Sequence, residues 1–406
     1  MDFSDTPEEA AFRQEARAFL DAHATPKAQA RPRSESEAEF LARARAWQKL
    51  KQENGWACLN WPKEYGGRGA TAMEQIIWGQ EEARYDVPVS PFAIGLGMCG
   101  PTVIAFAGDA EKARYLPRMA AGEELWCQLF SEPAGGSDVA NLRTRAVRDG
   151  DEWVVNGQKI WTSGAHYCDY GILLTRTDPS VPKHRGLTMF IVDMKAPGVE
   201  IRPIRQASGA SGFNEVYFTD VRIPDAHRLG GVGDGWKVSI VTLMNERLAV
   251  GAARGPDAAE LLQLAQQLEL DDAPAIRDRA VRERIADWYC EQSGLRFTKL
   301  RVQSALSRGG TPGPENSITK IVSANKLQGI GSFGMDLMDT GGVLVDEQPM
   351  DGQFHGAWLS APGLRIAGGT DEILRNIIAE RVLGMPGDVR VDKNVPFTEV
   401  PQGGKG

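Results

Sequence analysis

Residues 127–138 read Cys127-Gln128-Leu129-Phe130-Ser131-Glu132-Pro133-Ala134-Gly135-Gly136-Ser137-Asp138. Here the spacing of apolar residues changes from the helical period to the alternation typical of β-strands. Two adjacent glycines followed by Ser137 and Asp138 let backbone amides approach a ligand closely, and the hydroxyls of Ser131 and Ser137 can bond a polar ring or a phosphate. The alternative is a plain loop that joins a helix to a strand.

The periodicity on either side of this stretch predicts the domain order. Before it the pattern is helical, and Thr6-Pro7 followed by two glutamates predicts a helix start. After it the pattern is strand-like to about residue 235, and Asn156-Gly157 predicts a hairpin turn. Long helical patterns then return. The predicted parts are an N-terminal all-α domain (1–125), a central β domain (126–235), a C-terminal α-helical domain (236–395) and a polar tail (396–406).

The composition limits the functions open to the chain. Its 406 residues are enough for two or three domains with a sizeable buried core. A formal charge of -8, without a compensating basic block, argues against binding to nucleic acid or to an anionic membrane. Five scattered cysteines without a CxxC pair indicate neither a disulfide framework nor a zinc site, so we expect a cytoplasmic protein without bound metal. The acidic N-terminus and the absence of an apolar run of roughly 20 residues predict no signal peptide and no membrane span.

A second motif follows further along the chain, Lys159-Ile160-Trp161-Thr162-Ser163-Gly164-Ala165. A tryptophan can cover one face of an isoalloxazine ring, and a nearby hydroxyl or amide can bond the N5 edge of that ring. Taken alone, Trp161 is more often a core residue than a cofactor wall. The two motifs at this spacing are far more specific together than either is alone.

Together these segments resemble the acyl-CoA dehydrogenase family, and the resemblance covers essentially the whole chain. Three further stretches support it, namely residues 61–67, 150–159 and 369–384. The resemblance implies a mostly α fold with a central β domain: an N-terminal helical domain, a middle β-barrel-like domain and a C-terminal helical bundle. It also implies an FAD enzyme that desaturates acyl-CoA thioesters between Cα and Cβ and passes electrons to an electron-transfer flavoprotein.

The resemblance also implies cofactor contacts in three groups. Those near the flavin are Gln128, Leu129, Ser131, Trp161 and Ser163; those near the pyrophosphate or the substrate are Gly136 and Ser137; those at the start of the last helix are Thr370 and Glu372. Thr370 is also a good N-cap, so the alternative for this stretch is an ordinary helix start. The glycine loop departs from the usual Gly-Ala-Gly-Ser order of the family, which leaves its turn type open.

One departure from the family pattern concerns the chemistry. Many members carry the proton-abstracting glutamate directly before the Gly-Thr of the C-terminal motif, where this chain has Gly368. Isovaleryl- and long-chain-type members place it instead on a helix, before an arginine, and Glu246-Arg247 matches that placement. We predict Glu246 as the base, Arg247 as a residue that steadies the substrate or the base, and the Gly368 backbone amide as a donor to the thioester carbonyl. The alternative for Glu246 is a helix-surface glutamate paired with a neighbour.

The sequence leaves the assembly and two rival functions open. Many homotetrameric members carry an Arg-Lys-x-Phe-Gly stretch that reaches the FAD of a neighbouring subunit, and this chain lacks it. Family members also make a second cross-subunit contact through a glycine pair, to which Gly341-Gly342 corresponds here. A homotetramer, a homodimer and a heterotetramer with a related chain all stay open. The rivals are a non-catalytic, pocket-completing subunit and a flavin oxidase or monooxygenase on the same fold. The missing side chain at 368 favours branched, long or polycyclic acyl groups over short linear ones.

Overall fold

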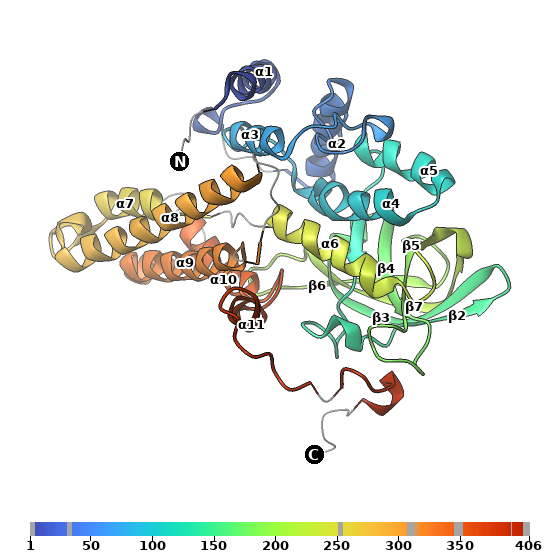
Figure 1. Cartoon of the computed structure of the whole chain (residues 1–406). Coiled ribbons are helices and arrows are strands. Elements are labelled where there is room, and N and C mark those ends of the chain that lie inside the picture. The colour runs from blue at the N-terminus through green and yellow to red at the C-terminus, as the bar shows by residue number, and fades with distance from the viewer. Residues whose placement is uncertain are drawn as a thin grey trace. The chain divides into compact units, whose positions relative to one another are not determined.

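The fold is that of a computed structural model, which describes residues 5–30, 35–250, 255–306, 313–314, 316–344, 352–390 and 392–400. The side chains of residues 246–250, 303, 306 and 316 lie outside this description. The chain divides into two compact units (Figure 1). The larger unit comprises residues 2–206, 210–249 and 389–406, and the smaller one consists mainly of residues 250–388.

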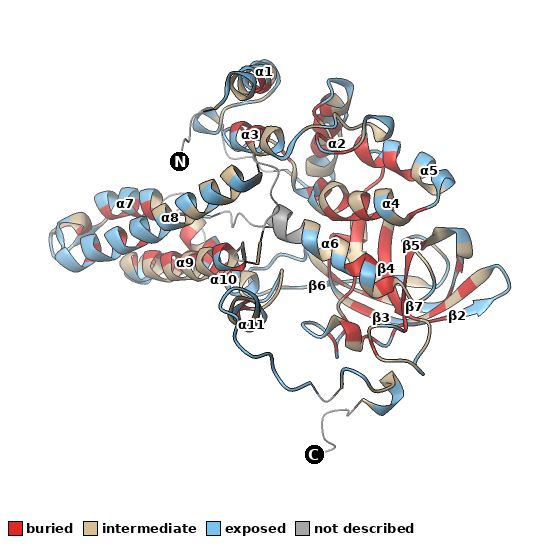
Figure 2. Cartoon of the chain, in the orientation of Figure 1, coloured by how far each residue is buried: buried red, intermediate tan, exposed pale blue. Residues whose placement is uncertain are grey.

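An eight-stranded sheet forms the centre of the larger unit. The strands are β1 Trp126–Leu129, β2 Arg145–Asp149, β3 Glu152–Ser163, β4 Tyr170–Arg176, β5 Leu187–Asp193, β6 Val199–Ile204, β7 Phe213–Pro224 and β8 Arg228–Leu229. Their spatial order is β6-β7-β3-β2-β4-β5-β8, and β1 pairs in parallel with β4. The apolar runs of β4 and β5 are buried almost throughout, so the core lies on these strands (Figure 2). All eight strands lie between residues 126 and 229, so the strand-like pattern predicted for this part of the chain is confirmed.

The predicted hairpin turn at Asn156-Gly157 is wrong. Both residues lie inside the long strand β3, and the turn between β2 and β3 is formed by Gly150 and Asp151. The Asn156 side chain is used across the sheet instead: its amide donates to Asp220 Oδ1 at 2.9 Å, and its oxygen accepts the Asp220 N–H at 3.0 Å. Gly157 has a φ of 152°, and a Cβ there would lie 2.4 Å from Thr144 Oγ1. The glycine therefore serves close packing at a bulge rather than a turn.

Six α-helices belong to the described part of the larger unit. They are α1 Pro7–His23, α2 Glu37–Glu53, α3 Ala72–Glu82, α4 Gly100–Phe106, α5 Asp109–Ala120 and α6 Gly235–Val250. The predicted start of α1 is confirmed, because Thr6 accepts the amide of Glu9 while the Glu9 carboxylate accepts the amide of Thr6. Val238 of α6 packs in the same core cluster as Leu187 and Met189 of β5. Helix α6 is therefore attached to the sheet, as Figure 1 shows.

The smaller unit is a helical bundle. Its helices are α7 Ala258–Gln267, α8 Arg279–Leu306, α9 Asn316–Leu337, α10 Gln353–Leu364 and α11 Asp371–Arg381, with a short strand pair β9 Glu269–Leu270 and β10 Ala273–Pro274. Glycines on α9 let α10 approach closely, since a Cβ on Gly334 would lie 2.3 Å from Phe354 Cδ1. Phe354 and Trp288 are buried in the core of this unit. None of the helices in the described part of the chain is long and apolar enough to cross a bilayer.

A pair of glycine substitutions tests the packing at the start of α4. A Cβ on Gly100 would lie 2.0 Å from Cζ2 of the buried Trp61, so Gly100→Ala should lower the free energy of unfolding by about 1–3 kcal/mol through overpacking. Gly79 is exposed within α3, and a Cβ there would meet no atom within 4 Å. Gly79→Ala should therefore raise the free energy of unfolding by about 0.5–1 kcal/mol. Denaturant unfolding of both variants measures the difference. Equal effects would contradict the packing described here.

Candidate active site

Hydrogen bonds join the two sequence motifs of the larger unit. The Ile160 N–H donates to Ser131 O at 2.9 Å. The Lys159 ammonium donates to Phe130 O at 3.1 Å and to Glu132 Oε1 at 2.8 Å. The loop after β1 and the end of β3 are therefore one structural element, although a long stretch of chain separates them.

The Glu132–Lys159 ion pair at this junction is buried. Lys159 is 0% exposed and Glu132 is 7% exposed. The Glu132 carboxylate also accepts the backbone amides of Arg143 at 2.6 Å and Thr144 at 2.9 Å. Burial opposes ionisation of Glu132, but Lys159 and these amides outweigh it and hold the pKa of the carboxyl below its usual value. The sequence did not reveal this pairing, although Glu132 lies in the middle of the first motif and Lys159 begins the second.

Trp161 occupies a strained position beside this junction. Its φ is 61°, in the left-handed region, which costs a residue other than glycine about 1–3 kcal/mol. The strand register shifts between Lys159 and Thr162, so the bulge turns Trp161 out of the regular pleat. The indole is 56% exposed and meets the Phe213 ring edge-on at 6.0 Å. Backbone strain that exposes a large ring is a feature of ligand sites.

The other predicted residues of this unit lie around the same element. Gln128, Ser131 and Ser163 are half-buried, whereas Gly136 and Ser137 are exposed. Leu129 is different, because its side chain is fully buried in the core and only its backbone can meet a ligand. Thr162 was not predicted; its buried hydroxyl has no hydrogen-bond partner among the described residues.

The glycine loop that follows has a defined turn. Glu132 and Gly135 exchange backbone hydrogen bonds, each 3.0 Å long, which closes a turn at Pro133-Ala134. A Cβ on Gly136 would meet no atom within 4 Å. The loop therefore presents open backbone at Gly136, as a phosphate-binding segment requires.

Helix α6 carries Glu246 and Arg247, whose side chains lie outside the described residues. One turn earlier, Thr242 is fully buried and its hydroxyl lies 2.8 Å from the hydroxyl of Thr102 in α4. Helix α4 follows directly on a π-helical turn, Gly95–Cys99, an irregularity that is frequent at functional sites. A buried polar contact therefore fixes the rotation of α6 against α4.

In the smaller unit, Gly368 and Gly369 form a left-handed turn before α11, with φ values of 67° and 91°. Asp371 anchors the turn: it is 2% exposed and its carboxylate accepts from Arg365 Nε at 2.8 Å and Asn325 Nδ2 at 3.2 Å. The Lys320 ammonium donates to Gly369 O at 2.6 Å. Asp371 thus fixes the Gly368 backbone, a role that the sequence analysis did not give it.

The remaining predicted residues of this unit begin α11. Thr370 is the N-cap, as predicted, and accepts the amide of Ile373 at 3.2 Å. Glu372 is exposed in the first helical turn. The Gly368 amide donates to no residue in the described part of the chain.

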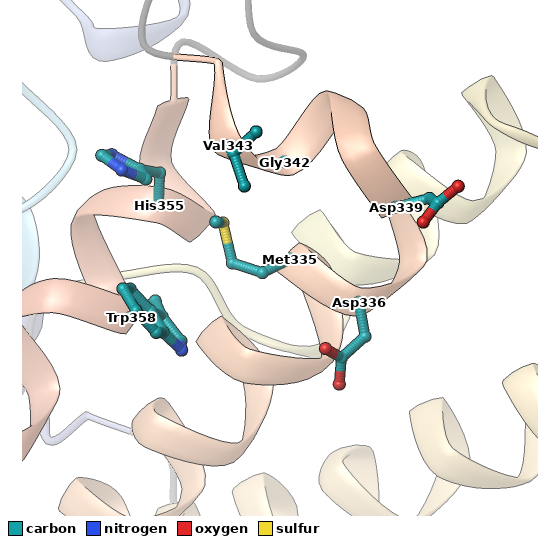
Figure 3. Close-up of a pocket in the computed structure, with 7 residues that line it drawn as sticks. All are labelled: Met335, Asp336, Asp339, Gly342, Val343, His355 and Trp358. Carbon is teal, nitrogen blue, oxygen red and sulfur yellow. The ribbon is translucent and has the colours of Figure 1, made fainter.

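The smaller unit also contains a hollow of about 420 Å³. Its lining residues come from α9, α10 and the turn between them: Met335, Asp336, Asp339, Gly342, Val343, His355 and Trp358. Figure 3 shows Met335 at the centre, the rings of His355 and Trp358 on one side and the two carboxylates on the other. Gly342 of the predicted glycine pair lines this hollow, whereas the residues predicted to bind flavin or to act in catalysis do not.

Family comparisons agree with this arrangement. The acyl-CoA dehydrogenase N-terminal, middle and C-terminal domain models match residues 6–123, 127–221 and 233–383. Acyl-CoA dehydrogenase IpdE1 of Mycobacterium tuberculosis is 37% identical over 87% of this chain and 91% of its own length. The chain belongs to the acyl-CoA dehydrogenase family. It is an oxidoreductase of that type, and members of the family depend on FAD.

Two further kinds of relative were found. Acyl-CoA dehydrogenase FadE34 of the same organism is 40% identical over 82% of this chain, which spans only 45% of the length of FadE34. A chain of the ChsE4-ChsE5 complex from Mycobacterium tuberculosis matches with a TM-score of 0.78 and 32% identity, covering 96% of this chain and 100% of that one. The Tcur3481-Tcur3483 steroid ACAD matches with a TM-score of 0.78 and 28% identity over the same shares.

The residues of the larger unit fit FAD. An exposed indole held out of the pleat suits one face of an isoalloxazine, and the half-buried Ser163, two residues further along the chain, supplies a hydroxyl. The open backbone at Gly136 suits a phosphate. No other charged side chain lies in this element beyond the satisfied Glu132–Lys159 pair and exposed Asp138, so a neutral ring system is the expected occupant.

Substitution of the buried acid tests the junction. Glu132→Gln leaves the Lys159 ammonium buried without its counter-charge, which should lower the free energy of unfolding by about 3–5 kcal/mol at neutral pH. Replacing both partners, as in Glu132→Gln with Lys159→Met, should recover much of the loss, because no buried charge is then unpaired. Denaturant unfolding monitored by tryptophan fluorescence measures each value.

The difference in the free energy of unfolding between wild type and Glu132→Gln should depend on pH. Because the folded pKa of Glu132 is depressed, its stabilisation is fully present above the unfolded pKa, about 4.3, and is lost as pH falls through the lower folded pKa. The difference between wild type and Glu132→Gln should therefore shrink below about pH 4. If the difference in the free energy of unfolding grew as the pH fell, Glu132 would not be the ionised partner of Lys159.

Proposed function

We propose that this chain catalyses the α,β-desaturation of an acyl-CoA thioester, with Glu246 as the base that takes the Cα proton. The observation that carries the proposal is the junction at Glu132–Lys159, which brings the hydroxyls of Ser131 and Ser163 and the exposed Trp161 into one element. Such an element suits binding of a flavin ring and is hard to explain as core packing. When bound, FAD accepts the hydride that leaves Cβ.

The backbone at Gly368 supports a relocated base. With a φ of 67°, this position strains any side-chain-bearing residue, so a glutamate there would cost stability that glycine avoids. The turn instead offers its amide, which needs no side chain to donate to the thioester carbonyl. Asp371 and Lys320 hold the turn in place, so the amide is pre-organised.

Position 246 suits a base on α6. It comes four residues after Thr242 on the same helix. Thr242 itself is buried against α4. A carboxylate in a dry site has a raised pKa and accepts a weakly acidic Cα proton more readily. Arg247 follows as a candidate to steady the substrate or the base.

The cofactor contacts follow from the positions already described. Trp161 would cover the flavin ring, with Gln128, Ser131 and Ser163 and the Leu129 backbone along its edge. Gly136 and Ser137 would meet the pyrophosphate or the substrate, and Thr370 and Glu372 would meet FAD from the start of α11. An electron-transfer flavoprotein would then take the electrons.

We also propose that the chain works in a heteromeric complex with a related chain. Two structural relatives, the ChsE4-ChsE5 complex and the Tcur3481-Tcur3483 steroid ACAD, each carry the names of two different proteins. In addition, this chain lacks the Arg-Lys-x-Phe-Gly stretch that many homotetramers carry. A polycyclic acyl group is the proposed substrate class. The steroid named in one structural relative and the missing side chain at Gly368 both support it.

Replacement of the base tests the catalytic assignment. Glu246→Gln should reduce desaturation by about 10² to 10⁴, the scale of a lost general base, while FAD stays bound. Glu283→Gln is the matched control, since Glu283 is an exposed helical glutamate that pairs with Arg279. Single-turnover flavin reduction with an acyl-CoA thioester measures the rate. Near-normal turnover of Glu246→Gln would remove Glu246 from the mechanism.

Anaerobic flavin bleaching tests the activity, the substrate class and the assembly together. The yellow chain, purified alone and with co-expressed related chains, is mixed with short linear, branched, long and polycyclic acyl-CoA thioesters. We expect polycyclic thioesters to bleach the flavin fastest, and a two-chain complex to hold more FAD than the chain alone. A colourless chain that completes a partner's site would support the non-catalytic alternative, and steady hydrogen peroxide production in air would support an oxidase.

A further inference from the structure

The C-terminal tail returns to the sheet of the larger unit. Pro396 forms a bridge with Pro182, the Phe397 N–H donates to Val181 O at 2.9 Å, and the Thr398 N–H donates to Pro179 O at 3.2 Å. The segment then makes a short 3₁₀ turn, Phe397–Glu399. These contacts attach the tail to the loop between β4 and β5.

Arg176 at the end of β4 connects that tail to the segment after the glycine loop. Its guanidinium carbon lies 3.5 Å from the centre of the Phe397 ring. The same guanidinium donates to Ala140 O at 2.6 Å, to Leu142 O at 3.1 Å and to Lys183 O at 3.2 Å. One buried cation thus orders residues 140–142 on one side and receives the tail ring on the other.

Lys183 makes the second connection, directly to the glycine loop. Its side chain is 8% exposed, and its ammonium donates to Asp138 Oδ2 at 2.7 Å and to the carboxylate of Asp392. Asp138 ends the Gly135-Gly136-Ser137-Asp138 stretch, and Asp392 belongs to the tail. The largely buried Lys183 ammonium therefore bonds two carboxylates, one from the glycine loop and one from the tail. Such charge-assisted hydrogen bonds are stronger than neutral ones and restrict both acids.

We propose that Lys183 is a positioning residue for the glycine loop and that residues 392–400 act as a strap that holds Lys183 in place. The strap seals the Lys183 and Arg176 cations from water, which strengthens their bonds to Asp138, Ala140 and Leu142. The loop is thereby fixed before its ligand arrives, which lowers the ordering cost of binding. The inference rests on the proposed function for the ligand of the loop, the FAD pyrophosphate or the acyl-CoA.

The same segment also touches α6. His184 packs edge-on against Trp236 in the first turn of α6, with ring centres 4.6 Å apart. The Gly233 N–H donates to Thr188 Oγ1 at 3.1 Å just before that helix. Residues 183–188 therefore support both the glycine loop and the start of the helix that carries Glu246.

Hydrogen exchange in the FAD-loaded full chain tests the strap without relying on turnover. Three variants are compared with wild type: Lys183→Met, Phe397→Ala and a deletion of residues 391–406. Each should speed amide exchange in residues 134–142 and raise the FAD Kd by about tenfold, the scale of losing a hydrogen bond to a charged group. Exchange in the β2–β3 hairpin should not change. The value of kcat should stay within about twofold while the KM for acyl-CoA rises, because the loop binds and does not react.

Lys195→Met is the matched control. Lys195 also pairs with a carboxylate of the same sheet, Asp169 at 2.7 Å, but it is exposed and remote from the tail, so its loss should leave all readouts unchanged. Combining Lys183→Met with the tail deletion should have less than the summed effect of the two changes, because both remove the Lys183–Asp392 contact.

Three outcomes would overturn the proposal. Wild-type exchange in residues 134–142 after the tail deletion would show that the tail does not hold the loop. Additive effects in the combined variant would show that Lys183 and the tail act separately. Equal acceleration in the β2–β3 hairpin would show general destabilisation. None of these readouts depends on the identity of the base, so failure of the Glu246 assignment would be seen separately, in the turnover of Glu246→Gln.

Discussion

The site of the larger unit depends on a buried ion pair between Glu132 and Lys159. Removing two charges from water costs several kcal/mol for each, and their attraction offsets this only when the geometry is good and the remaining hydrogen-bonding groups are satisfied. Both conditions hold, because Lys159 also donates to Phe130 O and Glu132 accepts two backbone amides. Any arrangement that separated the pair would be much less stable. The loop after β1 and the end of β3 are therefore held in one register, and the exposed Trp161 lies directly on that junction.

Each unit also holds a backbone conformation that L-residues rarely adopt. Trp161 carries the strain itself, in the left-handed region, and the bulge beside it turns the indole outward. At Gly368 and Gly369 glycine removes the strain, and the buried carboxylate of Asp371 fixes the turn. The left-handed region of φ therefore serves an exposed ring at Trp161 in one unit and a tight glycine turn at Gly368 and Gly369 in the other. Neither the Trp161 ring nor the Gly368 turn carries a charged side chain of its own.

The sequence predicted what depends on neighbours along the chain. The Thr6 and Thr370 caps are correct because capping joins residues three positions apart. The strands are correct because burial follows the period of the apolar residues. The Asn156-Gly157 turn failed because the amide of Asn156 bonds Asp220 on another strand, a partner that turn chemistry does not encode. The sequence predicted Leu129 at the flavin edge; the structure buries its side chain in the core, so that prediction now concerns its backbone alone.

The sequence by itself determined the order of helices and strands, the residue types of the motifs at 127–138 and 159–165, and the glycine at 368, since all of these are local patterns. Only the tertiary structure decided the charged partners: Lys159 for Glu132, and Lys183 for Asp138 and for Asp392 of the tail. These partners lie far apart in sequence, and the sequence around a charged residue does not indicate which distant opposite charge will pair with it. Packing of the elements makes that choice, because it fixes which charges leave water together and must therefore pair.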